Sequence, residues 1–160
     1  MNRIFKGGRV MKKIISVIIL VIFLLSLSSC KRNRDAYEML NEFILTYGAE
    51  GIIYSPKVTE GNDGYIRDGL IEKIYRFHGG FPENYAIFLN AHPDYSIECG
   101  IFVCCDVEMC ERVEEMCLER IKLLAMGDKR AFVKRSGNIV FYSTMPDRDR
   151  AEKIFNEIIR

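Results

Sequence analysis

The apolar and polar positions follow one pattern before Cys30 and another after it. The run from Ile14 to Leu27 is apolar except for Ser16 and Ser26, and charged residues follow directly after Cys30. Beyond residue 35, apolar positions recur with the periods of helices and strands. We therefore expect a targeting segment at residues 1–29, a tether at residues 30–35 and a single domain at residues 36–160.

The first half of the expected domain contains two helical patterns and two clear strand patterns. Apolar residues at helical spacing predict helices at Asp35–Tyr47 and Tyr65–Phe77. Alternating apolar residues predict strands at Asn84–Asn90 and Tyr95–Cys105. A long glycine-containing loop separates the two helices, with one short extended piece at Gly51–Tyr54.

The second half repeats the order strand, strand, helix in outline. A long helix begins after Asp106, which is a favourable N-cap residue. Strands at Arg130–Arg135 and Ile139–Ser143 form a hairpin, and the last helix opens at Asp147. The order strand-strand-helix-strand-strand-helix, preceded by two N-terminal helices, predicts an α+β two-layer sandwich. Its antiparallel sheet carries the helices on one face.

The segment before Cys30 has the features of a secretory signal. Lys12 and Lys13 precede the apolar run, and small residues precede the expected cleavage site. The sequence Leu27-Ser28-Ser29-Cys30 resembles the lipobox of bacterial lipoproteins, an aliphatic residue and two small residues before an invariant cysteine. This resemblance implies a diacylglyceryl group, with acyl chains such as palmitate, on the Cys30 thiol. Cleavage before Cys30 would then leave the protein lipid-anchored on the extracytoplasmic face of the cell membrane.

Two other interpretations of the apolar run are open. A permanent transmembrane helix needs about 20 apolar residues, which is more than the run supplies. A buried core helix would show a polar stripe, which the run lacks.

The residues before Met11 add basic charge to a signal that is already complete. The codons for Lys6-Gly7-Gly8 suit a purine-rich ribosome-binding site, so we expect translation to start at Met11.

The near-neutral total charge conceals an acidic domain. Five of the 23 Lys and Arg residues precede Cys30, and none of the 22 Asp and Glu residues does, so residues 30–160 carry a formal charge of −4. No basic stripe supports nucleic-acid binding. Lys31, Arg32 and Arg34 follow the expected lipid anchor, where each could add about 1 kcal/mol of attraction to anionic headgroups.

Five cysteines follow Cys30, an odd number that leaves at least one thiol unpaired in the monomer. Their spacing is irregular and lacks the C-x-x-C pairs of zinc sites, and only His78 and His92 are available as histidine ligands. Packing as small apolar residues is the favoured interpretation, with a disulfide or a metal site as alternatives. The weak metal candidates are Cys99, Cys104, Cys105, Cys110 and Cys117.

Glu98 and Arg120 are the most interesting polar pair. Glu98 lies within an apolar strand pattern, and Arg120 borders the apolar stripe of the helix that follows. We interpret them as a partly buried structural ion pair that fixes how the helix docks on the sheet. A ligand pocket that uses both is the alternative. The sequence contains no recognisable catalytic constellation, so no catalytic residue is assigned.

The stretch Tyr85–Ile159 resembles a domain-of-unknown-function family of small lipoproteins from clostridial bacteria. The similarity lies in Glu98-Cys99-Gly100-Ile101-Phe102, in the helix bearing Arg120, in Gly137–Tyr142 and in the helix from Asp149 to Ile159. The family has no established activity, so the resemblance implies architecture and location. The cysteines depart from its pattern.

Together these observations favour a non-enzymatic extracytoplasmic binding module, held to membrane lipid through Cys30 and lacking a cofactor apart from the diacylglyceryl group. Its partner would be a protein or another component of the cell envelope. The alternative is a lipoprotein that binds a small molecule or metal through the Cys99–Cys117 region.

Overall fold

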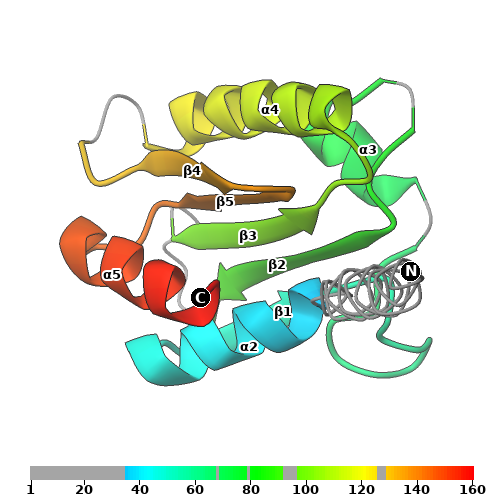
Figure 1. Ribbon diagram of the computed structural model, residues 1–160. Coiled ribbons are helices and arrows are strands. Elements are labelled where there is room, and N and C mark those ends of the chain that lie inside the picture. The colour runs from blue at the N-terminus through cyan, green and yellow to red at the C-terminus, as the bar shows by residue number, and fades with distance from the viewer. Residues whose placement is uncertain (1–34, 68, 79, 92–96, 126–128) are drawn as a thin grey trace, which may run out of the picture. The chain divides into compact units, whose positions relative to one another are not determined.

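The computed structural model describes residues 35–67, 69–78, 80–91, 97–125 and 129–160 (Figure 1). Residues 35–160 belong to one compact unit. The described helices are α2 (Ala36–Tyr47), α3 (Leu70–Tyr75), α4 (Val107–Ala125) and α5 (Arg148–Ile158). The described strands are β1 (Gly51–Tyr54), β2 (Asn84–Asn90), β3 (Glu98–Val103), β4 (Phe132–Ser136) and β5 (Ile139–Ser143).

The five strands form one antiparallel sheet in the order β1-β2-β3-β5-β4. Strand β3 lies at its centre, where Ile101 pairs with Ala86 of β2 and with Phe141 of β5. The α+β class, the antiparallel sheet and the predicted order of elements are confirmed.

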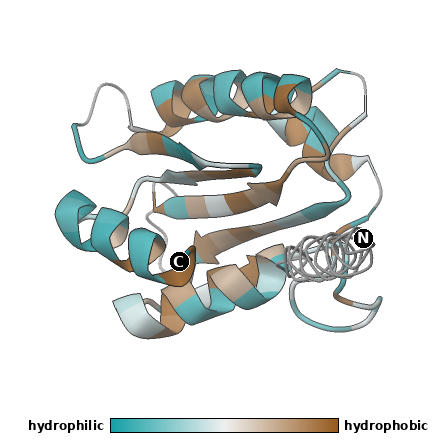
Figure 2. Ribbon diagram, in the orientation of Figure 1, coloured by the Kyte–Doolittle hydropathy of each residue, from teal (hydrophilic) through white to brown (hydrophobic). Residues whose placement is uncertain are grey.

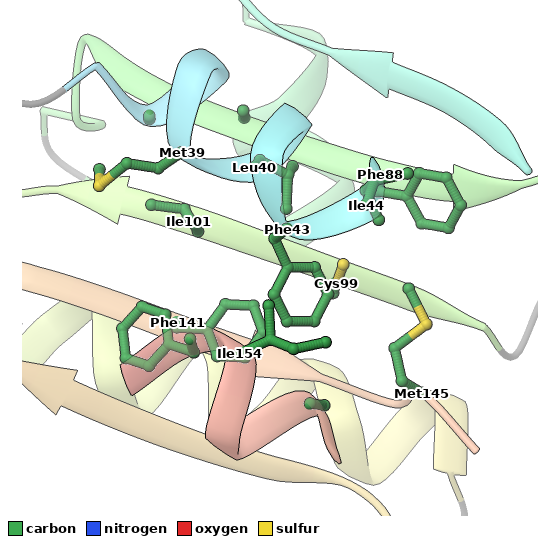
Figure 3. Close-up of a cluster of buried hydrophobic side chains, with 14 of the residues drawn as sticks. Met39, Leu40, Phe43, Ile44, Phe88, Cys99, Ile101, Phe141, Met145 and Ile154 are labelled. Atoms are coloured by element: carbon green, nitrogen blue, oxygen red, sulfur yellow. The ribbon is translucent and has the colours of Figure 1, made fainter. Parts of the chain in front are cut away.

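Helices α2 and α5 cover one face of the sheet. Phe43 of α2 lies 5.0 Å from Phe141 of β5 between ring centroids (Figure 3). Phe141 also stacks on Phe155 of α5, with 4.5 Å between the ring centroids. Alternate residues of the central strands complete this cluster, because successive side chains of a strand point to opposite faces. The sheet contributes Ala86, Phe88, Cys99, Ile101, Phe132, Ile139 and Phe141.

Helices α3 and α4 cover the opposite face. The strand residues that point this way pack against Val113, Met116 and Cys117 of α4 and against Ile71 and Tyr75 of α3. Helices therefore lie on both faces, which departs from the expectation that one face carries them all (Figure 1). Hydrophobic and hydrophilic residues alternate along α4 and α5, as expected for helices with one face against a sheet (Figure 2).

Local chemistry explains where several elements begin and end. Asp35 caps α2 by accepting hydrogen bonds from the backbone N–H groups of Tyr37 and Glu38. Helix α3 is shorter than the predicted Tyr65–Phe77, because Gly69 and Arg76 at its two ends adopt left-handed backbone conformations, with φ of 72° and 53°.

Several expectations concern residues before Asp35. The targeting segment, the start at Met11, the lipid-modified Cys30 and the tether all lie outside the described residues. Within the described ranges, no helix combines the length and the apolar character needed to span a bilayer.

Candidate functional site

Glu98 stands at the start of β3 with its side chain only 1% exposed. It shares a face of the strand with Gly100 and Phe102 and points toward α3 and α4. A buried carboxylate is costly unless charged and hydrogen-bonding partners surround it. The surroundings of Glu98 are therefore a candidate functional site.

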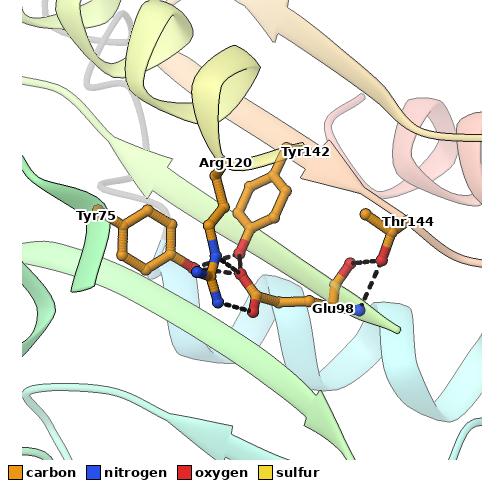
Figure 4. A network of polar contacts seen from close by, with 5 residues as sticks. All are labelled: Tyr75, Glu98, Arg120, Tyr142 and Thr144. Carbon is orange, nitrogen blue, oxygen red and sulfur yellow. Dashed lines mark hydrogen bonds and ion pairs between the residues drawn. The ribbon is translucent and has the colours of Figure 1, made fainter. Parts of the chain in front are cut away.

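Arg120 of α4 supplies the compensating charge. Its Nε–H donates to Oε1 of Glu98 at 2.9 Å and its Nη2–H donates to Oε2 at 2.6 Å (Figure 4). The structure thus brings together the two residues that the sequence singled out. The hydrogen bonds to Glu98 raise the pKa of the Arg120 guanidinium. This paired geometry matches the planar fork of arginine to the two carboxylate oxygens.

Two tyrosines complete the surroundings of Glu98. The Tyr75 hydroxyl of α3 donates to Oε1 of Glu98 at 2.7 Å, and the Tyr142 hydroxyl of β5 also donates to Oε1 (Figure 4). The two hydroxyl oxygens also contact each other, and because each hydroxyl has one proton, only two of these three contacts can be hydrogen bonds at one time. Burial raises the pKa of both phenols, and the negative charge of Glu98 raises it further. Both tyrosines therefore serve as neutral donors.

Backbone contacts fix the position of Glu98. Its N–H donates to Oγ1 of Thr144 at 2.7 Å, and the Thr144 hydroxyl donates to the Glu98 carbonyl oxygen at 3.0 Å. Gly100 leaves room for the ring of Tyr142, because a Cβ at this position would lie 2.5 Å from Cε1 of that ring. We call Tyr75, Glu98, Arg120, Tyr142 and Thr144 the Glu98 network.

The Glu98 network has the character of a structural connection. Oε1 accepts from Tyr75, Tyr142 and Arg120, and Oε2 accepts from Arg120. These four hydrogen bonds hold the carboxylate in one position. The network also joins α3, α4, β3 and β5, so it fixes both helices on one face of the sheet.

A pocket of about 350 Å³ opens between α3 and α4, beside the Glu98 network. Tyr75 and Arg120 belong to both features, so the buried network forms part of the pocket wall. The volume lies in the range of small-molecule sites, about 300–1,000 Å³. Its lining mixes charged with apolar side chains: Ile74, Tyr75, Arg76, Phe77, His78, Arg112, Glu115, Met116, Glu119, Arg120 and Leu123.

The five cysteines after Cys30 divide between the two faces of the sheet and the surface. Cys99 is buried beneath α2 and α5, whereas Cys104, Cys110 and Cys117 are buried on the other face and Cys105 is exposed. Burial raises the pKa of the Cys99, Cys104 and Cys117 thiols, which disfavours the thiolates that bind metals. Among the described residues, no group of three or more potential ligands is placed to hold a metal ion.

The sequence did not identify Tyr75, Tyr142 or Thr144 as members of a site. Tyr142 lies in the middle of a strong strand pattern and Tyr75 in a helical stripe, so both looked like ordinary core residues. The available signal was Glu98 itself, because a buried acid requires several donors, and tyrosine hydroxyls are donors compatible with an apolar core.

Comparisons with protein-family models, with curated proteins and with solved structures found no match. Functional inference for this chain therefore depends on its own residues and geometry. The features that carry it are the lipobox-like sequence at Cys30, the Glu98 network and the pocket between α3 and α4.

Proposed function

We propose that this chain is a lipoprotein anchored to the extracytoplasmic face of the cell membrane through acylated Cys30, and that residues 36–160 form a non-enzymatic binding module. The observation that carries the proposal is the sequence Leu27-Ser28-Ser29-Cys30 directly after a short basic and apolar segment. Two acyl chains on one cysteine supply the two signals that stable membrane anchoring requires.

The short tether supports this assignment. Helix α2 begins at Ala36, so five residues separate Cys30 from the first residue of the helix. A fully extended chain of this length spans about 20 Å, which holds the domain close to the membrane surface. Lys31, Arg32 and Arg34 fall in this tether, where anionic headgroups would attract them.

The Glu98 network supports a binding role over catalysis. Its carboxylate accepts hydrogen bonds from three side chains, which suits a fixed structural connection. The adjacent pocket is a feature with which the module could recognise a component of the envelope. The resemblance to small clostridial lipoproteins of unknown activity is part of the same proposal.

Metabolic labelling with an alkyne fatty acid, followed by membrane fractionation, tests the anchor in a bacterial host that processes lipoproteins. The wild-type chain should incorporate the label and sediment with membranes, whereas Cys30→Ala should lose the label and escape cleavage before residue 30. Cys105→Ala is the matched control, because it removes an exposed cysteine from the domain and leaves the lipobox-like sequence intact.

Two outcomes would contradict the proposal. Unchanged labelling of Cys30→Ala would show that the acyl chains are attached elsewhere. Absence of label from the wild-type chain, with membrane association through an uncleaved apolar segment, would establish the transmembrane interpretation instead.

The alternative metal site in the Cys99–Cys117 region has less support. Cys99 and Cys117 are buried on opposite faces of the sheet, so one ion cannot be bound by both. Native mass spectrometry with thiol counting tests it directly, since bound zinc with protected thiols would revive this alternative.

A further inference from the structure

We propose that the pocket between α3 and α4 binds a small organic anion, a carboxylate attached to an apolar ring or chain. This inference deepens the proposed function and rests on it, because it assigns the ligand class of the binding module. Three properties of the pocket carry it: an arginine held in place, an excess of cationic side chains, and an apolar wall.

Arg120 offers a preorganised donor to the pocket. Its Nε and Nη2 are bound to Glu98, while its Nη1 makes no hydrogen bond with a described residue. The guanidinium also lies 5.1 Å from the centroid of the Tyr75 ring. Because these contacts fix the side chain before any ligand arrives, little conformational entropy is lost when it binds an oxyanion.

The pocket contains more cations than anions. Three arginines line it, Arg76, Arg112 and Arg120, together with the acids Glu115 and Glu119. Glu98 already pairs with Arg120, and Lys122 pairs with Glu119 at 2.6 Å. Arg76 and Arg112 therefore remain against the single acid Glu115. Arginine is well suited to bind carboxylates because it can offer two parallel N–H donors.

Apolar side chains form the rest of the lining. Arg112 lies 5.3 Å from the centroid of the Phe77 ring, so a cationic group and an aromatic surface stand side by side. Met116 in the middle of α4 is buried, while Ile74 and Leu123 remain 42% and 58% exposed. Exposed large apolar residues beside a pocket mark a place where an apolar ligand would remove surface from water.

A titration with 1-naphthoate and with 1-naphthamide tests the proposal. The two probes share a ring system and differ in charge. The full chain is labelled with ¹³C at its methionine methyl groups and held in uncharged detergent micelles, and methyl NMR reports the bound position. Met116 lines the pocket, whereas Met39 and Met145 lie in the cluster beneath α2 and α5. A Met116→Leu variant assigns the Met116 signal.

We expect 1-naphthoate to shift the Met116 signal saturably and to leave Met39 and Met145 unchanged, with 1-naphthamide binding at least about fivefold more weakly. Arg112→Gln should weaken 1-naphthoate binding about fivefold and leave 1-naphthamide within twofold. Lys153→Gln is the matched control, because it removes one positive charge from α5 on the opposite face of the sheet. Should Arg112→Gln fail to fold, Arg76→Gln makes the same test at an exposed position.

Three results would overturn the proposal: an unchanged Met116 signal at saturating 1-naphthoate, equal affinities for the two probes, or an equal effect of Lys153→Gln and Arg112→Gln. None of them bears on Cys30. If Cys30 is labelled while Met116 does not respond, the ligand assignment fails and the anchor stands. If Met116 responds while Cys30 is not labelled, the anchor fails and the pocket stands.

Discussion

Arg120 and Glu98 form a two-point ion pair that joins α4 to the central strand of the sheet, and the two partners differ in their access to water. The Glu98 side chain is 1% exposed, whereas the Arg120 side chain is 19% exposed. Removing Glu98 therefore leaves a partly exposed positive charge, whereas removing Arg120 leaves a buried negative charge. An unpaired Arg120 can turn toward solvent, but an unpaired Glu98 stays in the core.

Arg120→Gln should consequently destabilise the domain more than Glu98→Gln does. Removing one partner of a buried pair costs about 3–5 kcal/mol, and we expect Arg120→Gln to fall in this range and Glu98→Gln below it. The measurement is the free energy of unfolding in urea for both single variants and for the double variant.

The double variant separates direct pairing from unrelated damage. If the pair interacts as its geometry indicates, the double variant should lose less than the sum of the two single losses. Strict additivity would show that the ion pair does not contribute as a unit.

Thr144→Val should destabilise the domain by about 1–3 kcal/mol, because the Glu98 N–H loses its hydroxyl acceptor in a buried position. Valine has nearly the same shape as threonine, so packing changes little. Thr46→Val on the exposed side of α2 is the matched control and should stay within about 0.5 kcal/mol of the wild type. Equal losses for both variants, measured by urea unfolding, would argue against a special role for Thr144.

Tyr142→Phe should flatten the loss of stability at alkaline pH. Burial raises the pKa of Tyr142 in the folded state, so above pH 10 the unfolded chain releases a proton that the folded chain retains. The contribution of protonated Tyr142 to the free energy of unfolding is thus fully present below about pH 10. It declines as the pH rises, by up to about 1.4 kcal/mol per pH unit for one group. Urea unfolding between pH 9 and 11.5 should show a shallower slope for the variant. Parallel slopes would mean that Tyr142 ionises as readily in the fold as outside it.

One of the five cysteine thiols of the domain should react fast with a thiol reagent, and the other four should react slowly. In the Cys30→Ala chain, Cys105 should react with a disulfide reagent within the native state, and Cys99, Cys104, Cys110 and Cys117 only after unfolding. Hydrogen bonding to Asp106 raises the pKa of the Cys105 thiol, so its reaction should accelerate as the pH increases. A total below five thiols in denaturant would reveal a disulfide, and two fast thiols would contradict the burial pattern.

Local pattern was sufficient to predict most elements, because period and capping depend on neighbouring residues. The helix at Ala36–Tyr47 and the hairpin of β4 and β5 follow from apolar spacing and turn residues alone. The limits of α3 required the backbone conformations of Gly69 and Arg76, which helical spacing does not reveal.

The sequence contained a sign that helices cover both faces of the sheet, but the search for alternating apolar residues did not use it. Ile139-Val140-Phe141-Tyr142 is apolar at every position, which is typical of a strand covered on both sides. Glu98-Cys99-Gly100-Ile101-Phe102 shows the same burial, so the acid at its start had to find partners inside the protein.

The sequence by itself determined the α+β order of elements, the lipobox-like sequence at Cys30, and Glu98 and Arg120 as candidate partners. Only the tertiary structure decided that Tyr75 and Tyr142 would meet Glu98, and that Cys110 and Cys117 of α4 would be buried on the face of the sheet opposite Cys99. The physical reason is that β3 and β5 are neighbours in the sheet, although α4 and β4 separate them along the sequence. Contacts of this kind depend on which strands become neighbours, and apolar periodicity along one segment carries no record of that choice.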